Sequence, residues 1–234
     1  MPTEVDQIKD RYTRRATAVG SGRYNLLNPA VYMSVQERER VLLRWIRDCG
    51  IAPVASRHLL EIGCGAGYNL LDFLRFGFHP DGLVGNELLP ERAQAARRVL
   101  PSGIPILTGD ALQLELPPES FDVVYQSAVF TSILDPDFRT ALARRMWTWV
   151  KPGGGVLWYD FIYDNPRNRD VAGVPLRGIR QLFPDGNLRY WRLTLAPPLA
   201  RALAGIHPAL YTAANAFPFL RTHVMCWIRK ADKG

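Results

Sequence analysis

The sequence predicts an α/β fold built on a doubly wound, mainly parallel sheet. From about residue 57 onward, short apolar segments alternate with segments of helical character, which is typical of strands joined by crossover helices. A glycine-rich turn at residues 63–67 follows the first of these strands, as expected where a strand meets a helix at a ligand-binding edge. The chain has 234 residues and is 47% hydrophobic, which suits one well-buried domain.

Seven strands and four intervening helices are predicted from residue 57 onward. The strands are residues 57–62, 82–86, 104–108, 121–126, 155–160, 189–195 and 222–229. The helices are residues 67–76, 90–100, 136–150 and 175–182. The fourth strand is an apolar run, as in a strand that is covered on both faces. Residues 151–155, Lys-Pro-Gly-Gly-Gly, are predicted to form a tight turn before the fifth strand.

The two ends of the chain differ in character from this alternating core. Residues 1–50 are predicted to form a helical arm or cap over the active site, and residues 51–234 the main domain. Within the arm, Pro29 opens a helix that runs to about Asp48. Residues 160–187 predict a long loop of the kind that carries function.

Residues 197–217 are largely apolar but are interrupted by prolines. Three explanations fit this composition. The segment could form a helix that packs on the sheet, could bury its surface in a dimer, or could contact a membrane or a lipid-linked acceptor.

The most informative segment is residues 59–67, which reads Leu-Leu-Glu-Ile-Gly-Cys-Gly-Ala-Gly. Glycine suits a backbone that turns sharply or lies against a ligand, and here glycines alternate at Gly63, Gly65 and Gly67. A dinucleotide-binding motif would need its third glycine at position 68, which is Tyr68. An NAD-dependent oxidoreductase is therefore the weaker interpretation.

The acid and glycines of this segment, Glu-x-Gly-x-Gly-x-Gly, resemble motif I of the class I S-adenosylmethionine (SAM)-dependent methyltransferases. The resemblance covers residues 57 to about 230. It implies a Rossmann-like, seven-stranded sheet with an antiparallel C-terminal strand, SAM as cofactor and S-adenosyl-L-homocysteine as product. The residues that it assigns to the cofactor are Glu61, Gly63, Cys64, Gly65, Gly67, Glu87, Leu88, Asp110, Ala111 and Gln126.

The resemblance gives individual roles to these residues. Glu61 and the glycine turn would hold the methionine moiety. Glu87 ends the second strand, where an acid can accept hydrogen bonds from both ribose hydroxyls; family members commonly carry Asp there. Leu88 would pack on the adenine, and Asp110 would accept from the adenine amino group. Gln126 lies at the carboxyl end of the fourth strand, where it could bond the SAM ammonium or the acceptor.

Acidic and aromatic residues crowd the segment after the fifth strand. Asp160, Tyr163 and Asp164 are candidates for the base that takes a proton from a hydroxyl acceptor, although methyl transfer can also rest mainly on positioning. The alternative is turn formation, which Asp-Asn-Pro favours. Asp164 and Asn165 resemble the Asp-Asn pair of metal-dependent O-methyltransferases. Those enzymes also carry an acid where this chain has Gln126, so Mg²⁺ is not favoured and no metal ligand is assigned.

Aromatic and amide residues near the N-terminus predict an acceptor-binding lid that suits a polar ring such as a sugar, although they could equally anchor the arm to the core. The predicted acceptor-binding residues are Tyr24, Asn28, Tyr32, Thr131, Asn165, Asn168 and His207. Many relatives carry a histidine at the position of Thr131. His223 lies in a predicted strand, where we expect a packed core residue.

The predicted function is SAM-dependent O-methylation of a sugar, a glycan precursor or a natural product. The alternatives are N-methylation of a small amine and a SAM-binding module without catalysis. The formal charge of +7 is spread along the chain without an RNA-binding signature, so nucleic acid is disfavoured as a partner.

Location and assembly are also predicted from the sequence. No apolar run is long enough to span a membrane, so membrane contact is expected to be peripheral at most. The three cysteines lack metal-site spacing, and the N-terminus lacks the apolar core of a signal peptide. We therefore expect a cytoplasmic protein, either a monomer or a homodimer.

Overall fold

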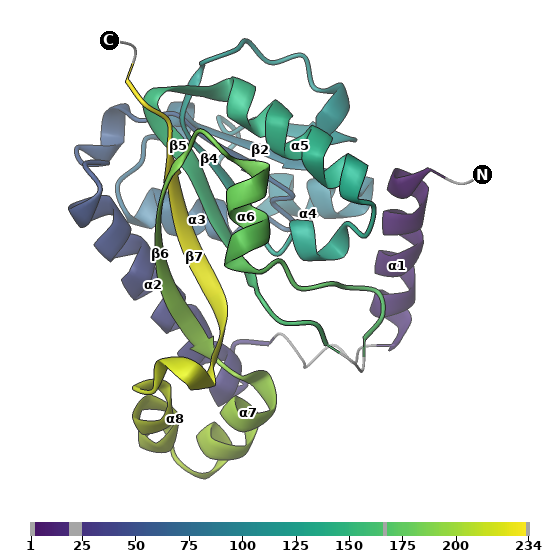
Figure 1. The fold of residues 1–234 in the computed structure, drawn as a ribbon. Coiled ribbons are helices and arrows are strands. Elements are labelled where there is room, and N and C mark those ends of the chain that lie inside the picture. The colour runs from purple at the N-terminus through teal and green to yellow at the C-terminus, as the bar shows by residue number, and fades with distance from the viewer. Residues whose placement is uncertain (1–2, 19–24, 166–167, 233–234) are drawn as a thin grey trace.

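The computed structural model describes residues 3–18, 25–165 and 168–232. Its centre is a seven-stranded sheet with the strand order β3-β2-β1-β4-β5-β7-β6, covered by helices on both faces (Figure 1). Strands β1 to β5 pair in parallel. Strand β7 is antiparallel to both β5 and β6. The predicted fold class, with its antiparallel C-terminal strand, is confirmed.

Apart from β5, the bounds of the strands agree with the predicted ranges to within about two residues. The strands are β1 (Leu59–Ile62), β2 (Leu83–Glu87), β3 (Ile106–Thr108), β4 (Phe121–Ser127), β5 (Val150–Phe161), β6 (Asn187–Leu195) and β7 (Arg221–Arg229). The α-helices are α1 (Glu4–Ala18), α2 (Pro29–Asp48), α3 (Tyr68–Arg75), α4 (Pro90–Val99), α5 (Pro136–Trp149), α6 (Leu176–Leu182), α7 (Pro197–Ile206) and α8 (Pro208–Asn215).

The segment predicted as a tight turn at residues 151–155 is instead part of β5, and the turn prediction is wrong. Val150 already pairs with Phe121, and the register then shifts before Val123 pairs with Gly155. The glycines thus allow an irregularity within the strand and do not form a turn that reverses the chain. Lys151 Nζ donates to Asp122 Oδ2 at 2.8 Å, which fixes the strand at this point.

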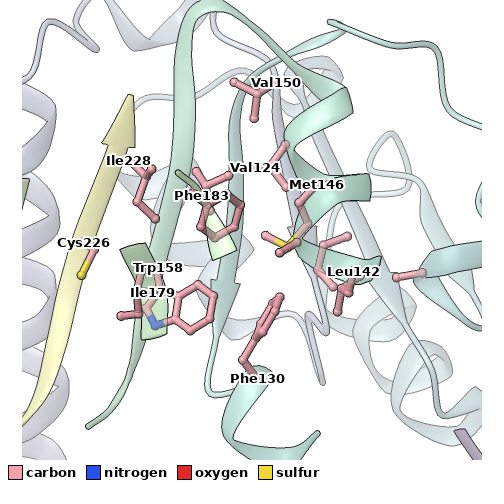
Figure 2. Packing of buried hydrophobic residues seen from close by; sticks show 14 of the residues in the cluster. Val124, Phe130, Leu142, Met146, Val150, Trp158, Ile179, Phe183, Cys226 and Ile228 are labelled. Atoms are coloured by element: carbon pink, nitrogen blue, oxygen red, sulfur yellow. The ribbon is translucent and has the colours of Figure 1, made fainter. Parts of the chain in front are cut away.

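One face of the sheet packs against α5 and α6 (Figure 2). Phe130 and Trp158 are fully buried there, and their ring centroids lie 4.4 Å apart. Met146 of α5 and Ile179 of α6 belong to the same buried cluster. Such close packing of large side chains fixes where β4 and β5 end.

The opposite face packs against α2 and α3. Leu42 and Trp45 of α2 are buried with Phe73 of α3, and the Trp45 ring lies 5.4 Å from that of Trp227 in β7. Helix α2 therefore belongs to the hydrophobic core, although it lies within the predicted N-terminal cap. The division into a cap of residues 1–50 and a domain of residues 51–234 stays a prediction.

The apolar segment between β6 and β7 forms two short helices, because prolines begin both α7 and α8. Ala200, Ala204 and Tyr211 of these helices pack against Ala30 at the start of α2. Figure 1 shows the pair beyond the end of the sheet where β6 stops and β7 begins. Within the part of the chain that the structure describes, no helix is long and apolar enough to cross a membrane.

The carboxylate of Asp122 stabilises the start of β4 through hydrogen bonds. It accepts hydrogen bonds from His58 N, Arg57 and Lys151. Burial alone would raise the pKa of Asp122, but these hydrogen bonds outweigh burial and lower it. The stabilisation is therefore present above the ordinary pKa of about 4 and disappears as the pH falls through the lower folded-state value.

We expect Asp122→Ala to lower the free energy of unfolding by about 1.5–3 kcal/mol at pH 7, because hydrogen bonds to a charged group are lost. Urea unfolding measures the change. Asp185→Ala, at an exposed position, is the matched control and should change stability by less than about 0.5 kcal/mol. Equal stability of the two variants would contradict this role for Asp122.

Candidate functional site

A cavity of about 200 Å³ lies at the carboxyl edge of the sheet, where the strand order reverses between β1 and β4. Ligands bind at this position in open α/β sheets. The residues that line it include Tyr12, Gly63, Glu87, Leu88, Asp110 and Ala111. The structure thus brings together the predicted residues from the ends of β1, β2 and β3.

The glycine turn after β1 has a backbone that other residues would strain. Gly63 and Gly65 adopt φ values of 67° and 59°, in the left-handed region that favours glycine. A Cβ on Gly63 would lie 2.5 Å from Val129 Cγ2, and one on Gly65 would lie 2.6 Å from a guanidinium nitrogen of Arg92. The turn therefore packs so closely against Val129 and Arg92 that neither position has room for a side chain.

Glu87 orders this turn and also lines the cavity. Its Oε2 accepts from Gly65 N at 2.7 Å, and its Oε1 accepts from Leu89 N at 2.9 Å. An ionised carboxylate has about four acceptor positions. The two backbone bonds therefore leave Glu87 able to accept hydrogen bonds from a diol.

The adjoining part of the cavity is more apolar. Leu88 and Ala111 both pack on the α5–α6 core. Asp110 Oδ1 accepts from Leu112 N at 2.9 Å, which caps a short helical turn at Ala111–Gln113. Two apolar side chains beside one carboxylate suit a flat ring that carries a hydrogen-bond donor.

Glu61 of β1 is fully buried and only half satisfied. Its Oε1 accepts from Asn69 Nδ2 at 2.6 Å, while its Oε2 has no hydrogen-bond partner among the described residues. Burial raises the pKa of Glu61 to about 7, against the opposing effect of the Asn69 hydrogen bond. A carboxyl group in this state is suited to receive a cation from a ligand.

Arg38 of α2 is a cationic residue near Glu61 that was not predicted from the sequence. Its Nε is buried without a hydrogen-bond partner, and within the described parts of the chain no carboxylate lies within 4.0 Å of its guanidinium. The carboxylates of Asp72 and Glu61 still act on it electrostatically. Arg38 lies four residues before Leu42 and seven before Trp45, so an arginine on the apolar face of the helix was a usable signal.

Two other predicted cofactor residues serve mainly to shape the backbone. Gln126 is buried; its Oε1 accepts from Val129 N at 3.0 Å, and its Nε2 donates to Tyr159 O at 3.4 Å. The turn that it holds contains Ala128, which has an unusual φ of 57°. Cys64 is buried, and its backbone N–H donates to Asn86 O at 2.8 Å.

The structure separates the three candidates for a catalytic base. Asp160 is fully buried, and its carboxylate accepts from the backbone N–H and the hydroxyl of Thr131 at 3.2 and 2.6 Å. Burial raises the pKa of Asp160 to about 7, against these hydrogen bonds. Tyr163 and Asp164 are exposed in the loop beyond β5, and Asp164 accepts from Gly173 N. Their assignment as bases stays a prediction.

Most of the predicted acceptor-binding residues are also accounted for by local structure. Asn28, Asn168 and His207 each accept a hydrogen bond from the backbone N–H two residues later, which for Asn28 and His207 caps α2 and α8. Thr131 is buried and donates to Asp160. The other three are exposed in the structure (Tyr32 and Asn165) or lie outside the described residues (Tyr24).

Helix α1 covers one side of the cavity, to which Val5, Ile8 and Tyr12 contribute. A buried ion pair of 2.5 Å joins its Arg11 to Glu4. Glu4 also accepts from Leu134 N at 2.8 Å, and Arg11 donates to Ser132 O at 3.2 Å. These bonds dock α1 on the segment that follows β4.

In residues 3–18, 25–165 and 168–232, no three His, Cys, Asp or Glu side chains are grouped so that they could hold a metal ion.

Residues 60–158 match the protein family described as "Methyltransferase domain". Ubiquinone biosynthesis O-methyltransferase of Albidiferax ferrireducens is 28% identical over 163 residues, which are 68% of this chain and 61% of that protein. Sterol 24-C-methyltransferase of Aspergillus fumigatus is 30% identical over 128 residues, which are 50% of this chain and 33% of that protein. The chain thus spans less than two thirds of the length of these relatives.

The fold is shared with solved structures. The SAM-dependent methyltransferase from Mesorhizobium loti superposes with a TM-score of 0.59 at 16% identity, over 76% of this chain and 92% of that chain.

The glycine turn gives a direct test of the site. We expect Gly65→Val to abolish measurable SAM binding in isothermal calorimetry, because the side chain fills the space beside Arg92 and strains a φ of 59°. Gly205→Val is the control, since a Cβ there meets no atom within 4 Å, and it should bind SAM as the wild type does. Retained affinity in Gly65→Val would place the cofactor elsewhere.

Proposed function

We propose that this chain is a class I SAM-dependent methyltransferase that transfers the methyl group of SAM to a hydroxyl group of a small molecule. The observation that carries the proposal is the pair of incompletely satisfied groups, Glu61 Oε2 and Arg38 Nε. SAM ends in an amino acid. Its ammonium group can bond to Glu61, and its carboxylate can bond to Arg38. Burying unsatisfied polar groups is costly, so a ligand of this chemistry would relieve both.

The rest of the cavity fits the remaining parts of SAM. Glu87 has acceptor capacity left for the ribose hydroxyls, and Asp110 lies beside Leu88 and Ala111 for the adenine. Gly63 of the glycine turn lines the cavity between these residues and Glu61, where its lack of a side chain lets the ligand approach the backbone. Each part of the cofactor thus has a matching group in the chain.

SAM, when bound, supplies a methyl group that its sulfonium already activates. The chain therefore has to position an acceptor and keep water out rather than generate a strong nucleophile. Helix α1 supports this role by covering one side of the cavity through its bonds to the segment after β4. The docked helix would have to move, or leave a gap, for SAM to enter.

A small-molecule hydroxyl is the best-supported acceptor. The relative that covers 68% of this chain is named an O-methyltransferase of ubiquinone biosynthesis, whereas the sterol C-methyltransferase covers half of it. A sugar or glycan precursor has less support, since the Asn28 amide that suggested it caps α2. A cytoplasmic location and a monomeric or homodimeric state remain predictions.

Transfer of labelled methyl from SAM into a fractionated extract of the source cells tests the function. We expect label in the small-molecule fraction, in a product that carries an O-methyl group. Label confined to protein or RNA would contradict the proposal. SAM binding without label in any fraction would favour a non-catalytic module, and an N-methyl product would favour the amine alternative.

Arg38 gives a prediction that is independent of the acceptor. Arg38→Met removes the cation but keeps much of the aliphatic stem, so SAM should bind about 10- to 100-fold more weakly, as expected for the loss of a charge-assisted hydrogen bond. Arg40→Met, at an exposed position of the same helix, is the matched control for calorimetry. An unchanged dissociation constant in Arg38→Met would remove Arg38 from the site.

A further inference from the structure

The segment between β6 and β7, called here the α7–α8 hairpin (residues 197–220), exposes large apolar side chains to solvent. Ile206 is 76% exposed and Leu210 is 40% exposed. Phe217 and Phe219, which follow α8, are 53% and 72% exposed, and their ring centroids lie 5.7 Å apart. A cluster of exposed apolar residues marks a surface that contacts a protein or a membrane.

The opposite side of the hairpin is firmly packed. Ala200, Ala204 and Tyr211 are buried against Ala30 at the start of α2. The corner between the two helices is fixed by His207, whose Nδ1 accepts from Ala209 N at 3.1 Å. The exposed apolar residues therefore belong to an ordered element whose own core is already formed without them.

The outer face of the hairpin lacks the polar cover that is usual for a helix in water. In α8, Leu210 and Ala213 are exposed together with Phe217, and the spacing of three and four residues places them on one face of a helix. Arg201 is the one Asp, Glu, Lys or Arg within residues 197–220. A surface helix of a globular protein normally carries charged and polar residues on its outer face.

The chain on both sides of the hairpin is basic. Residues 186–231 contain six Lys or Arg and no Asp or Glu. Arg201 is exposed, and Arg192 and Arg221 are partly exposed near the ends of β6 and β7 that meet the hairpin. In the described parts of the chain, no carboxylate oxygen lies within 4.0 Å of these three guanidinium groups. Their charge is therefore available to an anionic partner.

A carboxylate does contact the hairpin, but on its inner side. Glu37 of α2 accepts from the Tyr211 hydroxyl at 3.2 Å and from Thr194 N at 3.0 Å. Glu37 is buried, so it adds no negative charge to the outer surface. The exposed face of the hairpin thus combines apolar side chains with positive charge alone.

This combination suits an anionic lipid bilayer better than a second copy of the chain. Lys and Arg are attracted to anionic headgroups, while apolar side chains enter the boundary between headgroups and acyl chains. Two copies that met through the hairpin would instead bring like charges together, which disfavours association. The hairpin also projects beyond the sheet (Figure 1), so its exposed residues can reach a flat surface.

We propose that the α7–α8 hairpin is a peripheral membrane-binding surface, whose exposed apolar residues enter the headgroup region of an anionic bilayer while the neighbouring arginines contact lipid phosphates. This binding goes beyond the proposed methyl transfer and does not depend on it. Because β7 is antiparallel to β5, the hairpin lies at the carboxyl ends of the parallel strands, the edge that carries the cavity. Membrane binding therefore turns that edge toward the lipid.

Flotation of the full chain with lipid vesicles tests the proposal without a methylation assay. We expect the protein to float with vesicles of phosphatidylcholine and phosphatidylglycerol in equal parts. Vesicles of phosphatidylcholine alone should bind it at least about 10-fold more weakly, because the attraction between arginine and anionic lipid is absent. High salt should release protein from the mixed vesicles by screening the charges. A wild type that does not bind the mixed vesicles would overturn the proposal.

Variants locate the binding surface on the hairpin. The double variant Phe217→Ser and Phe219→Ser should bind the mixed vesicles about 10- to 100-fold more weakly, because two apolar rings are lost. Arg201→Gln should bind about 5-fold more weakly. Val99→Ser, at an exposed position at the end of α4, is the control and should bind as the wild type does. Circular dichroism checks that each variant is folded. A folded double variant that binds as tightly as the control would overturn the proposal.

Light scattering distinguishes the membrane from a second copy of the chain. Without lipid, the wild type and the double variant should have the same molar mass. A dimeric wild type with a monomeric double variant would assign the hairpin to a dimer interface and overturn the proposal. Neither measurement involves methyl transfer, so failure of the proposed function would leave the membrane-binding result unchanged.

Discussion

A buried carboxyl group, Glu61, and a half-buried arginine, Arg38, whose Nε is enclosed, lie near each other without forming an ion pair. Glu61 belongs to β1, and Arg38 is held in place because Leu42 and Trp45 anchor α2 in the core. Burial of two such groups opposes folding unless they are compensated. The raised pKa of Glu61, about 7, lowers the cost because much of the group is uncharged near neutral pH. The glycine turn beside them leaves space for a ligand that could compensate both, and this constraint ties the fold to the function proposed for it.

The two faces of the sheet contribute differently to the proposed site. On the α5–α6 face, Asp160 is enclosed by its hydrogen bonds to Thr131, which hold the segment after β4 where α1 docks. On the α2 face, the corresponding edge keeps partly exposed rings, with His223 beside Phe161. In this account the α5–α6 face holds the cover over the cofactor. The buried carboxylate of Asp160 is then a support for the loop.

Local sequence patterns were sufficient for much of the fold and for the conformation of the glycine turn. The alternation of strands and helices predicted the sheet, and the spacing of Gly63, Gly65 and Gly67 predicted a turn whose φ values are indeed positive. Arg38 was missed because its surroundings, which include Glu61 and Asp72, come from residues far away in the sequence. The turn predicted at residues 151–155 failed for a related reason, since pairing of Val150 with Phe121 overrides the local preference of the glycines. Asn28 and His207 failed in the opposite way. Both were predicted to bind the acceptor, but in the structure each caps the start of a helix.

The most direct test of the account is whether SAM binding releases a proton from Glu61. An ammonium placed beside a carboxyl group lowers the pKa of that group, so a Glu61 that is partly protonated near pH 7 should lose its proton when SAM binds. Calorimetry at pH 7 in two buffers of different ionisation enthalpy measures the release. The account predicts proton release by the wild type and by Asp160→Asn, and none by Glu61→Gln. Proton release that persists in Glu61→Gln, or no proton release by the wild type, would contradict the account. In either case the carboxyl group of Glu61 would not be the group that binds the amino-acid end of SAM.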